Sequence, residues 1–107
     1  MRLSNQQLDI IKSIVTEKMH SAYKLFLFGS RIDDTKRGGD IDLAIQVTVK
    51  VSHPARLCAS IEAEISKKME GRKVDVVLIA PGLQFGSVHK AALESGILLD
   101  QRESVLV

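Results

Sequence analysis

Aromatic residues, cysteine and long apolar runs are all scarce in this sequence. Aromatic residues make up 4% of its 107 residues and tryptophan is absent, so few side chains are available on which single-stranded nucleic acid could stack. Cys58 is the only cysteine, which excludes an intrachain disulfide. No apolar run approaches the ~20 residues that span a bilayer, and the first ten residues lack the apolar core of a signal peptide. We therefore expect a cytoplasmic protein that does not enter membranes.

The length and charge of the chain indicate how many domains it has and whether it binds nucleic acid. Its 107 residues suit a single domain, residues 1–107, and its 45% hydrophobic and 26% charged residues suit a folded globular core. The formal net charge is +2, and basic residues gather in nothing longer than pairs such as Lys36-Arg37. Because nucleic-acid tracts need denser positive charge, no direct nucleic-acid binding is expected.

Two short apolar runs flank a polar loop in the first half of the sequence. The first run, Leu25 to Phe28, stops at Gly29 and is typical of a buried strand. The second run, Asp40 to Ile45, begins directly after two glycines and also predicts a strand. Side chains alternate between the two faces of a strand, so Asp40 and Asp42 are expected on the same face.

This pair of carboxylates indicates a metal site. Asp40 and Asp42 would repel each other on one face unless a cation lies between them, and Asp is depleted in strands. Magnesium, a hard ion that prefers oxygen ligands, would relieve this repulsion and still leave positions for phosphate oxygens. Gly29 permits close backbone approach, its N–H and that of Ser30 can hold a phosphate, and Arg31 adds positive charge. The residues therefore predict a site for a metal-bound polyphosphate.

These residues carry a resemblance to a known family. The pattern of Gly29-Ser30, nine further residues and then Asp40-x-Asp42 resembles the signature of nucleotidyltransferases of the DNA polymerase beta superfamily. Within it, the chain is most similar to minimal nucleotidyltransferases, small proteins that are often the antitoxins of HEPN-domain toxins. The resemblance implies an α/β (α+β) fold, in which helices pack on a small mixed β-sheet.

The resemblance also implies an activity and assigns residues to it. AMP would pass from ATP to a hydroxyl group, that of a tyrosine, on a HEPN-domain toxin encoded by a nearby gene. Asp40, Asp42 and a third carboxylate, Asp75, would bind two Mg²⁺ ions and act in catalysis. The nucleotide phosphates would be bound by Gly29, Ser30 and Arg31. Larger members of the superfamily carry a helical domain that shapes the acceptor pocket, so here a partner protein is expected to complete the site.

Several alternatives remain open on the sequence alone. Gly29-Ser30 alone would suit a plain turn, and Asp40-x-Asp42 the outer face of an edge strand; only their combination favours a site. Asp75 interrupts a Val-rich run and could instead face water or pair with Lys73. At the level of function, the chain could neutralise its partner by binding alone, or could transfer AMP to a small molecule such as an aminoglycoside.

The remaining elements follow from apolar periodicity and from cap and turn residues. A capping box of Ser4 with Gln7 predicts the start of the first helix, and Gly71 the end of the second. The expected helices are Asn5–His20, Ala55–Met69 and Ser87–Glu94, the further strands are Lys73–Ile79 and Ile97–Leu99, a continued or bent strand is expected over Val47–Val51, and a loosely held tail over Gln101–Val107.

Overall fold

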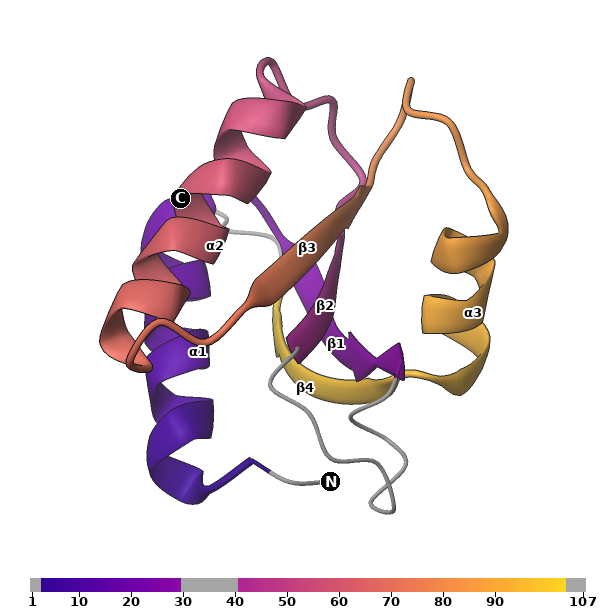
Figure 1. Cartoon of the computed structure of the whole chain (residues 1–107). Helices are drawn as coiled ribbons and strands as arrows, with labels where there is room; N and C mark the ends of the chain where they lie inside the picture. The colour runs from indigo at the N-terminus through magenta and orange to yellow at the C-terminus, as the bar shows by residue number, and fades with distance from the viewer. Residues whose placement is uncertain (1–2, 30–40, 104–107) are drawn as a thin grey trace.

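Three helices and four strands make up the described part of the chain (Figure 1). The computed structural model describes residues 3–29 and 41–103. In chain order the elements are α1 (Asn5–Lys18), β1 (Tyr23–Phe28), β2 (Ile41–Gln46), α2 (Pro54–Lys68), β3 (Val74–Ile79), α3 (Ser87–Ser95) and β4 (Ile97–Arg102).

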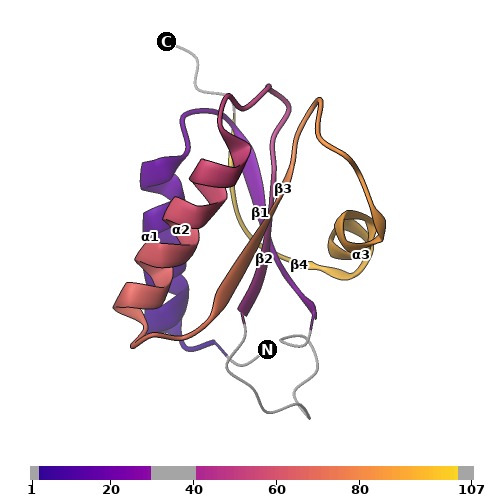
Figure 2. The ribbon, with the colours of Figure 1, turned by 45° about the horizontal axis from the view of Figure 1, so that its top comes forward.

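The strands form one mixed sheet between two layers of helix. The strand order is β3-β2-β1-β4, in which β2 and β3 are parallel and the other two pairs are antiparallel. The parallel pair is joined through α2, because parallel neighbours need a crossover rather than a tight turn. Helices α1 and α2 lie on one side of the sheet and α3 on the other (Figure 2). The predicted α/β (α+β) fold with a small mixed sheet is confirmed.

The main core lies between the sheet and the α1/α2 layer. Alternate residues of the strands enter it, as the two-residue period of a strand requires. Its fully buried large side chains are Ile11, Val15, Leu25, Leu27, Ile41, Leu43, Ile45, Ile61 and Ile65. A second, smaller cluster of Phe28, Ala44 and Ala92 lies on the opposite face, under α3. The sheet therefore has one thickly covered face and one lightly covered face.

The helix ends match the predicted signals closely. The Oγ of Ser4 accepts a hydrogen bond from the Gln7 N–H at 3.1 Å, and the Gln7 side chain accepts one from the Ser4 N–H at 2.9 Å, which confirms the capping box. Pro54 occupies the first turn of α2. At the other end of α2, Gly71 has a φ of +80° and its N–H donates to the Ser66 carbonyl at 2.8 Å.

Two predicted boundaries were wrong by more than two residues, and the first helix ends at Lys18 rather than at His20. The second strand does not continue over Val47–Val51 but ends at Gln46. The last strand continues past Leu99 to Arg102, so Gln101 and Arg102 belong to the sheet rather than to a loose tail. Arg102 donates hydrogen bonds to the carbonyls of Thr16, Met19 and Ser21, and its guanidinium lies 5.0 Å from the centre of the Tyr23 ring. These contacts hold the end of β4 against the end of α1.

Strand β3 forms one edge of the sheet and is partly covered by α2. The Val76 N–H donates a hydrogen bond of 2.8 Å to the carboxylate of Glu62, a half-buried residue of α2. An edge strand presents backbone groups that would otherwise pair with another chain, and a charged acceptor from a helix satisfies one of them. Glu62 therefore links the α2 layer to β3.

None of the described helices, within residues 3–29 and 41–103, is long and apolar enough to cross a bilayer.

Replacing Glu62 should test this link between α2 and β3. Glu62→Ala leaves the Val76 N–H without its acceptor, and an unsatisfied part-buried donor costs about 1–3 kcal/mol. We expect the free energy of unfolding, measured by urea titration, to fall by that amount. Glu62→Gln keeps an acceptor oxygen and should lose clearly less. Equal stability of the Glu62→Ala variant and the parent chain would contradict the proposed role.

Candidate functional site

Two of the predicted carboxylates stand side by side on neighbouring strands. In the register of β2 and β3, Asp42 is the direct partner of Asp75. On the other side of β2, Asp42 is the partner of Phe28 in β1. Since adjacent strands lie about 4.8 Å apart, the three residues form a continuous row across the sheet. This row lies at the end of the sheet where β1 finishes and where β2 and β3 begin.

Both carboxylates point to the lightly covered face of the sheet. Ile41 and Leu43 on β2, and Val74 and Val76 on β3, enter the main core on the α1/α2 side. Strand alternation therefore directs Asp42 and Asp75 to the α3 side. Both are half-buried rather than sealed in the interior. A ligand can reach carboxylates in such a position from solvent.

Gly29 lies directly against Asp42. It follows β1 and has a φ of +77°, a left-handed conformation that glycine adopts without strain. A Cβ added at Gly29 would lie 2.5 Å from Oδ2 and 3.1 Å from Cγ of Asp42. The space that a side chain would need is therefore already filled by the carboxylate. The absence of a side chain at this position allows the β1 terminus and Asp42 to meet.

The donor set suits a divalent cation. Two like charges on adjacent strands destabilise each other unless a cation or hydrogen-bond donors compensate them. Carboxylate oxygens are the ligands that Mg²⁺ prefers, and Mg²⁺ usually takes one or two of them together with water and phosphate oxygens. Asp42 and Asp75 provide two such ligands from two rigid strands. The two residues therefore fit a magnesium ion.

The structure describes half of the predicted site residues. Gly29, Asp42 and Asp75 lie together at one end of the sheet, because Gly29 lies against Asp42 and Asp42 is the strand partner of Asp75. Ser30, Arg31 and Asp40 lie outside the described residues. Among residues 3–29 and 41–103 no group of three or more His, Cys, Asp or Glu side chains could hold a metal ion. The structure therefore describes two of the three predicted carboxylate ligands, Asp42 and Asp75.

Cys58 lies away from this site. It belongs to α2, on the opposite face of the sheet, and is half-buried against the main core. Burial, with a smaller contribution from the Glu62 carboxylate, raises the pKa of the Cys58 thiol. A raised pKa lowers the thiolate fraction at neutral pH, which is the reverse of what a nucleophilic cysteine needs. The Cys58 thiol therefore suits packing against the core rather than nucleophilic chemistry.

A comparison with protein families finds a match over nearly the whole chain. Residues 9–104 match the model of the family described as "Polymerase beta, Nucleotidyltransferase". The matched segment contains every residue of the predicted site. No curated protein matches the sequence.

Solved structures with the same fold include antitoxins bound to toxins. One, a toxin–antitoxin with AMP-PNP, superposes with a TM-score of 0.65 at 16% identity, over 86% of this chain and 71% of that chain. Another holds a tri-AMPylated HEPN toxin of Shewanella oneidensis in complex with its MNT antitoxin, with a TM-score of 0.64 at 14% identity, over 91% and 71% of the two chains. A third is a mutant of the toxin–antitoxin MntA–HpeT, with a TM-score of 0.63 at 14% identity, over 86% and 70%. At these identities the likeness is one of fold.

Adding a methyl group at Gly29 should displace the Asp42 carboxylate. In Gly29→Ala the new Cβ meets Asp42 Oδ2, so that the carboxylate must turn away from its present position. We expect calorimetry to show weaker Mg²⁺ binding, by roughly tenfold if one of the two carboxylates ceases to coordinate. The left-handed φ also costs the variant about 1–2 kcal/mol of stability.

Gly71→Ala is the matched control for this experiment. Gly71 has a similar φ of +80°, and a Cβ added there meets no atom within 4 Å. It should lose comparable stability and bind Mg²⁺ like the parent chain. Unchanged Mg²⁺ affinity in Gly29→Ala would show that the contact between Gly29 and Asp42 does not position a metal ligand.

Proposed function

The chain belongs to the polymerase beta nucleotidyltransferase family, and from that premise we propose that it transfers AMP from ATP to a hydroxyl group of a HEPN-domain toxin and so acts as an antitoxin. The observation that carries this proposal is the in-register pair of Asp42 and Asp75 on one face of the sheet, with Gly29 against Asp42. The fold is that of antitoxins solved with AMP-PNP and with an AMPylated HEPN toxin, which supports the choice of nucleotide and partner.

The residues of the chain divide into a nucleotide side and an acceptor side. We assign Asp40 and Asp42 to the ions that accompany the triphosphate, and Gly29, Ser30 and Arg31 to the phosphates themselves. Gly29 lacks a side chain, so a phosphate can approach the backbone at the corner after β1. When bound, Mg²⁺ ions neutralise phosphate charge and stabilise both the attacking and the leaving oxygen of an in-line displacement.

We assign Asp75 to the second metal ion and to the acceptor hydroxyl. It lies on a different strand from Asp42, one strand spacing away, on the same face of the sheet. In the proposed reaction the acceptor oxygen bonds to the α-phosphorus of ATP while the bond from that phosphorus to the bridging oxygen breaks, and pyrophosphate leaves. The proton of the acceptor hydroxyl passes to Asp75, which also orients the acceptor. We take the acceptor to be a tyrosine of the toxin.

The partner is proposed to complete the acceptor side of the site. Asp42 and Asp75 are half-buried, and α3 covers only part of the face to which they point. A macromolecular acceptor can reach an accessible sheet end of this kind directly. A HEPN-domain toxin encoded by a nearby gene is the partner that fits this requirement.

Intact-mass spectrometry of the toxin distinguishes transfer of AMP to it from neutralisation by binding alone. We expect a small molar amount of this chain, with ATP and Mg²⁺, to modify an excess of its cognate toxin, each addition raising the toxin mass by one AMP unit. Asp75→Asn should still bind the toxin but should lower the rate of modification by at least about 10²-fold, which is the usual contribution of a general base. Asp9→Asn, at an exposed position on α1, is the matched control and should retain activity.

A different pattern would favour a binder without catalysis. In that case the toxin is neutralised only at a stoichiometric ratio, its mass is unchanged, and Asp75→Asn has no effect. An unmodified toxin from a verified cognate pair would contradict the proposed transfer, although not the fold.

A further inference from the structure

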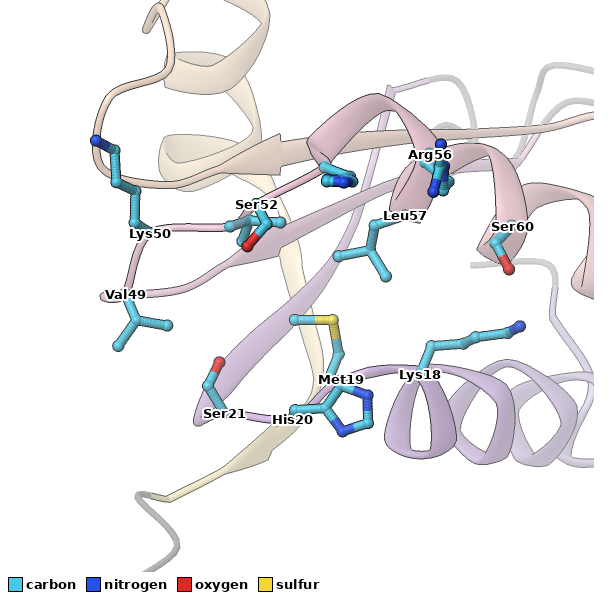
Figure 3. A pocket seen from close by; sticks show the side chains of 12 residues that line it. Lys18, Met19, His20, Ser21, Val49, Lys50, Ser52, Arg56, Leu57 and Ser60 are labelled. Atoms are coloured by element: carbon cyan, nitrogen blue, oxygen red, sulfur yellow. The ribbon is translucent and has the colours of Figure 1, made fainter.

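A positively charged pocket lies at the end of the sheet opposite the carboxylates. Its volume is about 560 Å³, within the ~300–1,000 Å³ range of small-molecule sites. It is bounded by the end of α1, the β2–α2 connection and the first turns of α2 (Figure 3). Asp42 and Gln46 are four residues apart on β2, which at about 3.3 Å per residue separates the pocket from the carboxylate row by more than 13 Å.

The pocket lining combines cationic side chains with an apolar centre. Lys18, Lys50 and Arg56 reach it from three different segments, and none of the twelve described lining residues is Asp or Glu. Met19 and Leu57 lie in the middle of the group of side chains, whereas Lys18, Lys50 and Arg56 lie at its edges and the Lys50 ammonium group points outward (Figure 3). The remaining lining residues are His20, Ser21, Val49, Val51, Ser52, His53 and Ser60. Five of them, the two His and the three Ser residues, carry a side chain that can donate a hydrogen bond to an anion.

The backbone around the pocket favours an anion as well. Helix α2 begins here, and its N-cap residue, His53, makes no side-chain capping bond, so the positive end of the helix faces the pocket region uncapped by a side chain. The end of α1 would oppose an anion through its carbonyl groups. However, the carbonyls of Thr16, in the last turn of α1, and of its C-cap residue Met19 accept hydrogen bonds from Arg102, which compensates that negative end.

We propose that this pocket binds a phosphorylated small molecule of nucleotide size. The cations and the start of α2 suit the phosphate, and the Met19–Leu57 centre suits an apolar or heterocyclic part. A nucleic-acid strand is a poorer fit, because the described lining holds no Phe, Tyr or Trp on which bases could stack. The site is separate from the one assigned to nucleotidyl transfer.

Amide chemical-shift mapping with AMP as the probe tests this proposal. The titration uses the Asp42→Asn chain in EDTA, so that metal-dependent nucleotide binding at the carboxylates does not contribute. We expect saturable shifts in Lys18–Ser21 and in Val49–Leu57. Inorganic phosphate lacks the nucleoside part of AMP and adenosine lacks its phosphate, so each should bind more weakly than AMP. Salt should weaken AMP binding, since Lys50 and Arg56 are exposed.

Charge-neutralising variants give the quantitative test. Lys50 and Arg56 are exposed, so Lys50→Gln with Arg56→Gln should fold normally and bind AMP roughly tenfold more weakly. Lys67→Gln with Lys90→Gln changes the net charge equally at exposed positions outside the pocket and should bind AMP like the parent. Shifts centred on Gly29, Leu43 and Val76 would overturn the proposal, as would equal affinity of the two double variants. So would tighter binding of a short RNA that is lost in the Lys50/Arg56 variant, since that would assign the pocket to nucleic acid.

Discussion

The register between β2 and β3 is the constraint on which the rest of the structure depends. It places Asp42 beside Asp75, a pairing of like charges that the packing of the two strands does not itself favour. A shift of β3 by one residue against β2 would turn β3 over and bring Asp75 into the apolar core. Burial of Ile41, Leu43 and Ile45 on the other face therefore fixes the register. The hydrophobic effect thus holds the two charges together at a place where a cation can bind them.

The main hydrophobic core lies on one face of the sheet, and the candidate site lies on the other. Helices α1 and α2 cover the face that contributes almost all of the large buried side chains, whereas α3 contributes only Ala92 to the small cluster opposite. The carboxylates are on the second face, where α3 leaves them half-exposed. The two ends of the sheet differ as well, since the end with Asp42 and Asp75 is negative and the pocket at the other end is positive. An arrangement of this kind keeps two charged sites apart within a small protein.

Local patterns in the sequence predicted much of this arrangement, and non-local packing explains what they missed. Gly29 after an apolar run, and Asp42 within another, could be identified because strand alternation and glycine geometry are local rules. The pairing of Asp42 with Asp75 depends on the crossover through α2 and was available only from the family resemblance. Arg102 looked like part of a tail because its acceptors, the carbonyls at the end of α1, are distant in sequence. Lys18, Lys50 and Arg56 looked scattered for the same reason.

The central claim is that Asp42 and Asp75 together form a divalent-cation site beside Gly29, and paramagnetic broadening by Mn²⁺ tests it most directly. Mn²⁺ is chosen because it shares the oxygen ligands of Mg²⁺. At substoichiometric Mn²⁺, the account predicts selective loss of the amide signals of Gly29, Leu43 and Val76, and the return of these signals in the Asp42→Asn, Asp75→Asn double variant. Broadening that is centred elsewhere on the chain, or that persists unchanged in the double variant, would contradict it.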